Sequence, residues 1–201
     1  MLLIFDFDGT LYDAFGVIQK LCRHLSPKYS LKDVSKKGIL KAFELNFFKG
    51  MLKNGLKKNK LKQFMKDCER WEKRNYNAKP FPGIITAVKE LAKTNNLVIV
   101  SSNFSKILNK VLKKDKLDFY FDDVFGADTG VSKAERLKFF VKKYGNKAVL
   151  ITDTLGDINA ANKAGLASVG VAWGLHSRQT LKKGRPSKII SNIKELTGLY
   201  G

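Results

Sequence analysis

Four short, mostly apolar runs recur along this chain, each about as long as a single β-strand: residues 2–5, 97–100, 148–151 and 168–172. They do not alternate apolar with polar residues, as strands with one wet face do. Continuous apolar runs are instead typical of strands buried on both faces of a parallel sheet. Weaker copies lie near residues 123–125 and 188–190. The pattern therefore predicts a parallel sheet that is covered by helices on both sides.

Helical periodicity fills the stretches between these runs, with apolar residues three and four positions apart. Asn192 and Glu195 resemble a capping box at the start of the last helix. Glycines at 145, 165 and 198 are placed to end three of the helices. This alternation of strand and helix indicates an α/β fold, a doubly wound parallel sheet of the Rossmann-like kind. The predicted helices cover about 84–91, 132–144, 157–164 and 192–198.

Residues 14–80 interrupt the alternation, because they contain no strand-like run. Their pattern predicts three helices, at about 15–25, 31–48 and 56–71, with Ser30 and Asp33 as caps for the second. We expect a small all-α domain at 14–80, inserted into an α/β core formed by residues 1–13 and 81–201.

The chain has 38 basic and 18 acidic residues, a net charge of +20, and residues 14–80 alone hold 18 basic and 5 acidic residues. One interpretation is an anionic partner such as nucleic acid. The other is coding bias toward lysine, which the 32 lysines, 6 arginines and 13 asparagines favour. The second interpretation leaves most lysines as a solvated surface.

Several classes of protein do not fit the sequence. No apolar run approaches the roughly 20 residues that cross a bilayer, so we expect no membrane partner. Acidic residues follow the first apolar run at once, unlike a secretory signal. Cys22 and Cys68 are too few for a disulfide framework or a four-cysteine zinc site, and we expect both to be buried. These features favour a cytoplasmic location.

Polar residues gather where the predicted strands end. In an open α/β sheet, ligands bind beyond the carboxyl ends of the strands. Carboxylates packed together there would repel one another, and Mg²⁺, which takes oxygen ligands, would relieve the repulsion. Lys133 begins a predicted helix against the helix dipole, so we expect it to hold an anion. The residues that follow the first three runs are Asp6, Phe7, Asp8, Ser101, Ser102, Asn103, Asp153 and Asp157.

Four motifs in this order resemble those of the haloacid dehalogenase-like superfamily of hydrolases. Residues 5–11, Phe-Asp-Phe-Asp-Gly-Thr-Leu, resemble its first motif, and residues 98–103 resemble its second. Lys133 matches the third, and residues 152–157 match the fourth in its DxxxD form. The tail from Trp173 is similar to that of phosphoglycolate phosphatase-like members. The resemblance covers about 1–13 and 80–201, with residues 14–80 in the place of a helical cap.

The resemblance implies a Mg²⁺-dependent phosphatase that forms an aspartyl-phosphate. Asp6 would be the nucleophile, Asp8 the general acid and base, and Lys133 the stabilising charge. An acid at position 8 favours phosphoryl transfer over dehalogenation in this family. The implied phosphate-binding residues are Phe7, Ser101, Ser102, Asn103 and Lys133. The implied metal-binding residues are Asp6, Asp8, Asp153 and Asp157.

The substrate stays open at this point. We expect a small phosphorylated molecule; the alternatives are nucleotides or nucleic-acid ends, or a phosphomutase-like phosphoryl transfer. A non-catalytic nucleic-acid binder would not need the set of acids. Of the other residues, we expect His24 at the surface and His176 near the site edge. The insert's aromatic residues would build its core. Nothing in the sequence fixes the oligomeric state.

Overall fold

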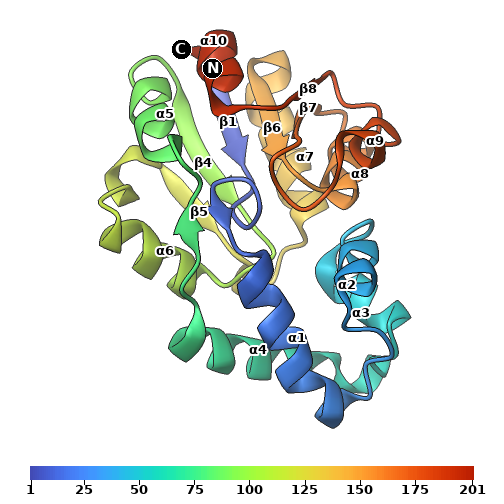
Figure 1. Ribbon diagram of the computed structural model, residues 1–201. Coiled ribbons are helices and arrows are strands. Elements are labelled where there is room, and N and C mark those ends of the chain that lie inside the picture. The colour runs from blue at the N-terminus through green and yellow to red at the C-terminus, as the bar shows by residue number, and fades with distance from the viewer.

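The computed structural model describes residues 1–201 and contains a six-stranded parallel sheet with the order β5-β4-β1-β6-β7-β8 (Figure 1). β1 lies at its centre, with Phe5 aligned to Ile99 of β4 on one side and to Ile151 of β6 on the other. The predicted doubly wound α/β fold is thus confirmed. The strands are β1 (Leu2–Phe5), β4 (Asn96–Val100), β5 (Asp123–Phe125), β6 (Ala148–Thr152), β7 (Ala167–Val171) and β8 (Lys188–Ile190).

Successive residues of the central strands face opposite sides of the sheet, and both sides are buried. Leu3 and Phe5 point into the larger hydrophobic cluster, which α5, α6 and α10 cover. Leu2 and Ile4 point into a second cluster under α7 and α8. Burial on both faces explains why these strands are apolar throughout. The helices are α5 (Ile84–Leu91), α6 (Ser105–Lys114), α7 (Lys133–Tyr144), α8 (Leu155–Ala164), α9 (Arg178–Lys182) and α10 (Ile193–Tyr200).

Two helix ends of the core differ from the prediction, and in the insert the helix expected at 56–71 runs from Leu61 to Asn75. The helix expected from 157 begins at Leu155, because the Thr154 side chain accepts the Asp157 N–H and caps it. The last helix does not stop at Gly198 but continues to Tyr200. Asn192 caps that helix as predicted, and its side chain accepts the Glu195 N–H.

Residues 14–80 form helices that lie beyond the carboxyl edge of the sheet (Figure 1). The helix expected at 31–48 is wrong: it is two short helices, joined by a turn at 43–46. Asn46 breaks it, because its side chain accepts the Phe48 N–H and so caps a new helix. The helices are α1 (Phe15–Tyr29), α2 (Lys36–Ala42), α3 (Phe47–Lys53) and α4 (Leu61–Asn75).

A two-stranded antiparallel pair connects the insert to the sheet. β2 (Tyr12–Asp13) and β3 (Lys79–Pro80) pair where the chain leaves and re-enters the core. The expectation of no strand within 14–80 missed β3, which is too short for a visible pattern. The pair supports the predicted division into a core, 1–13 and 81–201, and a cap, 14–80, which stays a prediction. None of the helices has the length and apolar character needed to cross a membrane.

Candidate active site

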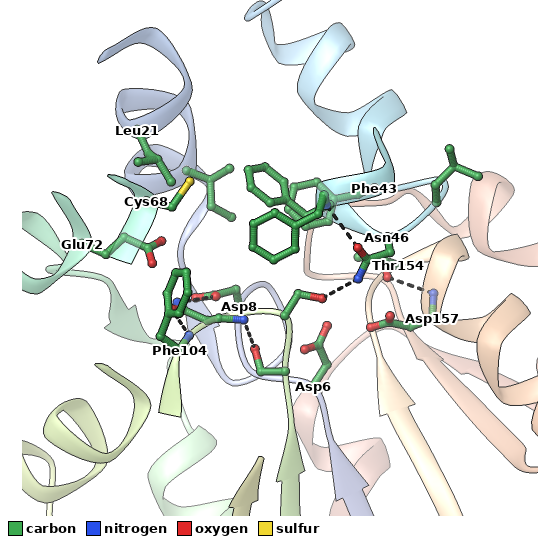
Figure 2. Close-up of a pocket in the computed structure, with 17 residues that line it drawn as sticks. Asp6, Asp8, Leu21, Phe43, Asn46, Cys68, Glu72, Phe104, Thr154 and Asp157 are labelled. Atoms are coloured by element: carbon green, nitrogen blue, oxygen red, sulfur yellow. Dashed lines mark hydrogen bonds between the residues drawn. The ribbon is translucent and has the colours of Figure 1, made fainter. Parts of the chain in front are cut away.

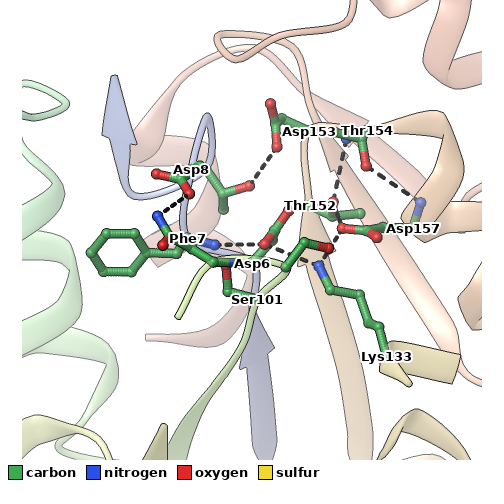
Figure 3. A network of polar contacts seen from close by, with 12 residues as sticks. Asp6, Phe7, Asp8, Ser101, Lys133, Thr152, Asp153, Thr154 and Asp157 are labelled. Atoms are coloured by element: carbon green, nitrogen blue, oxygen red, sulfur yellow. Dashed lines mark hydrogen bonds and ion pairs between the residues drawn. The ribbon is translucent and has the colours of Figure 1, made fainter. Parts of the chain in front are cut away.

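Asp6 lies directly beyond β1, the central strand, which has β4 and β6 as its neighbours. The end of β1 is held by a hydrogen bond from the Asp6 N–H to the Ile151 carbonyl, 2.9 Å. The Asp6 side chain is buried, and its Oδ1 accepts the Phe7 N–H at 2.8 Å. This is the place where open α/β sheets bind ligands. Figure 3 shows the polar network around it.

Lys133 joins two of the aspartates in this network. Its Nζ lies 3.0 Å from Asp6 Oδ1 and 2.6 Å from Asp157 Oδ2 (Figure 3). Only 7% of the lysine side chain is exposed. Burial alone would lower the pKa of Lys133, but the two carboxylates raise it above its usual value. The lysine is therefore a fixed positive charge beside Asp6.

One lysine does not balance the buried acids. Burial raises the pKa of Asp6 well above its usual value, although Lys133 opposes the rise. Burial would also raise the pKa of Asp157, but the Lys133 charge overcomes it and the pKa is lowered. Asp157 and Asp153 both add to the rise at Asp6. The site thus carries more negative charge than its own lysine neutralises.

Asp8 is held at both carboxylate oxygens. The Tyr76 hydroxyl donates to Oδ1 at 2.5 Å, and the Asn103 side-chain amide donates to Oδ2 at 2.8 Å. Burial raises the pKa of Asp8, and these two hydrogen bonds oppose the rise. A carboxyl with a raised pKa is suited to proton transfer near neutral pH.

Asp153 is fully buried at the end of β6. Its carboxylate accepts the Thr10 hydroxyl at 3.0 Å and the Leu175 N–H at 2.7 Å. Burial raises the pKa of Asp153 to about 7, against the effect of these donors. Gly9 has a φ of 84°, and a Cβ there would lie 2.0 Å from Asp153 Oδ2. Glycine in the first motif therefore allows the two loops to meet.

The remaining residues of the predicted site cluster at the end of β4. Ser101 is buried, and its Oγ accepts the Asn103 N–H at 3.0 Å. The Ser102 hydroxyl accepts the side-chain amide of Asn46, from the insert, at 3.0 Å. Asn103 itself is bound to Asp8, so its phosphate contact stays a prediction, as do those of Phe7, Ser101 and Ser102.

The donor set fits a hard divalent cation in its chemistry. Asp6, Asp153 and Asp157 supply buried carboxylate oxygens that repel one another and would be stabilised by a positive charge. Mg²⁺ prefers such ligands. The side chains are not gathered around one centre, however: no three acidic, histidine or cysteine groups in the structure form a metal-binding cluster. Metal binding by these residues stays a prediction.

A pocket between the insert and the core lies over this network (Figure 2). Asp6, Asp8 and Asp157 form part of its floor. Phe43, Phe47 and Phe48 from the insert line it, together with Phe104 from the core. Its free volume is about 40 Å³, which is room for a few water molecules.

Sequence reasoning missed two residues of the site, Tyr76 and Glu72. Glu72 lines the pocket from α4, and Tyr76, which directly follows that helix, binds Asp8. His176 is buried and connects the insert to the core: its Nδ1 accepts the Leu155 N–H, and its Nε2 lies 2.9 Å from the Leu40 carbonyl. His24 lies at the insert surface as expected. Only the apolar spacing of Phe64, Cys68 and their neighbours marked which face of α4 turns inward.

Comparison with known proteins gives the family. A family model for haloacid dehalogenase-like hydrolases matches residues 3–171, which is most of the chain.

This chain belongs to the haloacid dehalogenase-like hydrolases.

Curated relatives of this hydrolase match at low identity. "Probable phosphatase IndB" of Dickeya dadantii is 29% identical over 125 residues, which are 59% of this chain and 54% of that protein. "Phosphoglycolate phosphatase" of Synechococcus elongatus is 23% identical over 96% of this chain and 94% of its own. "Pyrophosphatase PpaX" of Bacillus velezensis is 22% identical, over 99% and 95%. The hydrolase thus spans about half the length of the first relative and nearly all of the others.

Solved structures share the fold of this hydrolase. A haloacid dehalogenase-like family protein from Streptococcus pneumoniae has a TM-score of 0.84 at 20% identity, covering 100% of this chain and 98% of that one. A predicted phosphatase from Clostridium acetobutylicum has a TM-score of 0.83 at 24% identity, covering 98% and 96%. Both alignments extend over the insert as well as the sheet.

Proposed function

We propose that this hydrolase is a Mg²⁺-dependent phosphatase, which cleaves phosphate monoesters of small molecules through an aspartyl-phosphate on Asp6. The observation that carries the proposal is the arrangement of Asp6, Asp8 and Lys133 at the end of β1: a buried carboxylate beside a buried ammonium and a second carboxyl. The curated relatives named as phosphatases support the same chemistry.

In the first step, Asp6 attacks the phosphorus atom and the bond to the ester oxygen breaks. Asp6 Oδ1 accepts from Phe7 and lies against Lys133, so Oδ2, which accepts no hydrogen bond, is the attacking atom. Asp8 gives its proton to the leaving oxygen, which departs as an alcohol. The raised pKa of Asp8 keeps that proton available.

In the second step, Asp8 accepts a proton from water, whose oxygen then attacks the phosphorus atom. The bond to Asp6 breaks, inorganic phosphate leaves, and both aspartates return to their starting states. Lys133 stabilises the charge on the phosphoryl oxygens in both steps. Tyr76 and Asn103 hold the Asp8 carboxyl in one orientation, which both proton transfers require.

A bound Mg²⁺ would neutralise charge between the phosphoryl oxygens and the aspartates. Asp6, Asp153, Asp157 and the backbone carbonyl of Asp8 would hold it. The excess of buried carboxylate over lysine supports this part of the proposal.

The pocket favours a small substrate over a nucleic-acid end. The insert closes over Asp6 with direct contacts: Asn46 donates to Ser102, and the Gly156 N–H donates to the Phe43 carbonyl at 3.2 Å. A free volume of about 40 Å³ means that these contacts must loosen for any substrate to enter, and a small molecule needs less opening than a polymer end.

Phosphate release from a panel of phosphate monoesters, with Mg²⁺ present, tests the proposal. We expect release by the parent protein and loss of more than about 99% of it in Asp6→Asn, because neutral amide oxygen is a poor nucleophile. Melting temperatures and circular dichroism establish that the variant is folded. Turnover by Asp6→Asn above that level excludes Asp6 as the nucleophile. Full activity after chelation of divalent cations excludes the metal.

A further inference from the structure

One acidic side chain of the pocket has no partner. Glu72 of α4 is 7% exposed, its carboxylate oxygens are reached by solvent, and no hydrogen bond or ion pair reaches them from any residue of the chain. Figure 2 shows the carboxylate directed into the pocket, above Asp8. Buried charges in proteins are normally paired. The protein itself supplies no positive or hydrogen-bonding group to this carboxylate.

The other charges of α4 show that this is a local feature. Glu69 is paired with Lys73 at 3.0 Å, and Asp67 is bound by Lys28 at 2.5 Å. Of the three acidic residues of α4, only Glu72 faces the pocket, and only Glu72 has no charged or hydrogen-bonding partner. Burial, and then the charge of Asp8, raise the pKa of Glu72 well above its usual value, and no lysine or arginine opposes them.

The lining of the whole pocket is negatively charged. Its 17 lining residues include four carboxylates and no lysine, arginine or histidine, in a chain with a net charge of +20. Two of the carboxylates, Asp6 and Asp157, share the single positive charge of Lys133. A substrate with a second anionic group, in its alcohol part, would therefore be repelled by the carboxylates of the pocket.

Aromatic rings complete this half of the pocket. Phe47 and Phe48 lie with their ring centres 5.3 Å apart, Phe43 stands 5.3 Å from Phe47, and Phe104 lines the core side. Aromatic faces attract organic cations, and a nearby carboxylate adds a charge-assisted hydrogen bond. A pocket lined by both a carboxylate and phenyl rings suits an ammonium group.

We infer that Glu72 determines specificity by binding the protonated amine of a small phosphorylated amino alcohol, whose phosphate group lies on Asp6. The inference rests on the proposed phosphatase function and names its substrate class. This specificity would differ from that of the relatives named for phosphoglycolate. The leaving group of phosphoglycolate carries a carboxylate. Such a leaving group would lie against Glu72 and be repelled.

Three esters that share a two-carbon chain test the inference: phosphoethanolamine, 2-hydroxyethyl phosphate and phosphoglycolate, which end in a cation, a neutral hydroxyl and an anion. For the parent protein we expect kcat/KM to fall in that order, by about tenfold or more from first to last, because one ion pair in a buried site is worth at least that factor. This part of the test needs no variant.

Glu72→Gln then removes the charge and keeps the shape. We expect kcat/KM for phosphoethanolamine to fall about tenfold, that for hydroxyethyl phosphate to change less than about threefold, and that for phosphoglycolate to rise. Glu69→Gln is the matched control, one turn away and paired outside the pocket, and should leave the order unchanged. If Glu72→Gln does not fold, Glu72→Asp replaces it and should keep the order with a smaller ratio.

The outcomes separate the inference from the function beneath it. Phosphoglycolate as the best of the three substrates, or an equal effect of Glu72→Gln on all three, overturns the role of Glu72 and leaves the phosphatase intact. Release from other monoesters but from none of these three does the same. No release from any monoester by folded parent protein contradicts the proposed function and removes the basis of the inference.

Discussion

At the scale of single residues, the site is defined by acids that the protein leaves short of positive charge. Lys133 is shared between Asp6 and Asp157, and Asp153 is satisfied only by neutral donors. Asp8 and Glu72 have no cation in contact at all. Such an arrangement lowers stability in the free protein and is expected where a ligand or a metal supplies the missing charge.

Glu72 makes this deficit measurable as a pH-dependent stability. Its pKa is raised in the folded state, so below about pH 4.5 the carboxyl is neutral in both states and has no ionisation penalty. As pH rises, the unfolded chain ionises while the folded one resists, and stability is lost. Glu72→Gln cannot titrate. We expect the ligand-free variant to melt with the parent near pH 4.5 and several degrees higher at pH 8, at about 2–4 °C per kcal/mol.

Scanning calorimetry of both proteins across that range checks this expectation, with Glu69→Gln as the partly exposed control, which should follow the parent at every pH. A melting temperature of Glu72→Gln that equals the parent's at pH 8 would mean that the carboxylate has a partner in solution after all. The inference on specificity would then lose its main physical support.

At the scale of elements, the turn between α2 and α3 closes the pocket against the start of α8. Gly156 lies so close to this turn that a Cβ would stand 1.6 Å from the Leu45 carbonyl oxygen. We therefore expect Gly156→Ala to displace the turn and open the pocket, lowering kcat/KM by about tenfold or more, since misplaced site groups have effects of that size.

Gly16→Ala in α1 is the control for this change, because no atom lies within 4 Å of its added Cβ. Alanine in a helix should stabilise the fold by about 0.4–1 kcal/mol and leave turnover unchanged. Steady-state kinetics and melting curves of the two variants make the comparison. Parent-like turnover by Gly156→Ala would show that this contact does not form during catalysis.

The same elements show what a sequence can and cannot predict. The central strands were predictable because burial on both faces leaves them almost wholly apolar, and Asp6, Ser101 and Asp153 followed because parallel strands end at one edge. The helix break at Asn46 was not predictable, because the Asn46 side chain caps a new helix and so divides the one expected helix into two. The positions of Tyr76 and Glu72 in the site were not predictable either, because they depend on how α4 packs over the core.

At the scale of the whole molecule, the surface and the pocket carry opposite charge. A cleft of about 310 Å³ beside Glu72 and Tyr76 is bordered by five lysines, at positions 73, 79, 106, 110 and 114. We call it the lysine cleft. A positive surface raises the encounter rate of a phosphate dianion, and salt screens the effect. The surface would thus attract the phosphate group, while the pocket selects what is attached to it.

The lysine cleft gives this division of labour a test. We expect replacement of Lys79, Lys106, Lys110 and Lys114 by Gln to lower kcat/KM at low ionic strength about tenfold, within the range known for steering, with kcat unchanged. The salt dependence of kcat/KM should flatten in parallel. The matched control replaces four exposed lysines at the opposite edge of the sheet, at 142, 143, 147 and 163. If both sets act equally, net charge attracts the substrate; if neither acts, the positive surface has no part in binding it, and the interpretation as lysine-rich coding bias remains.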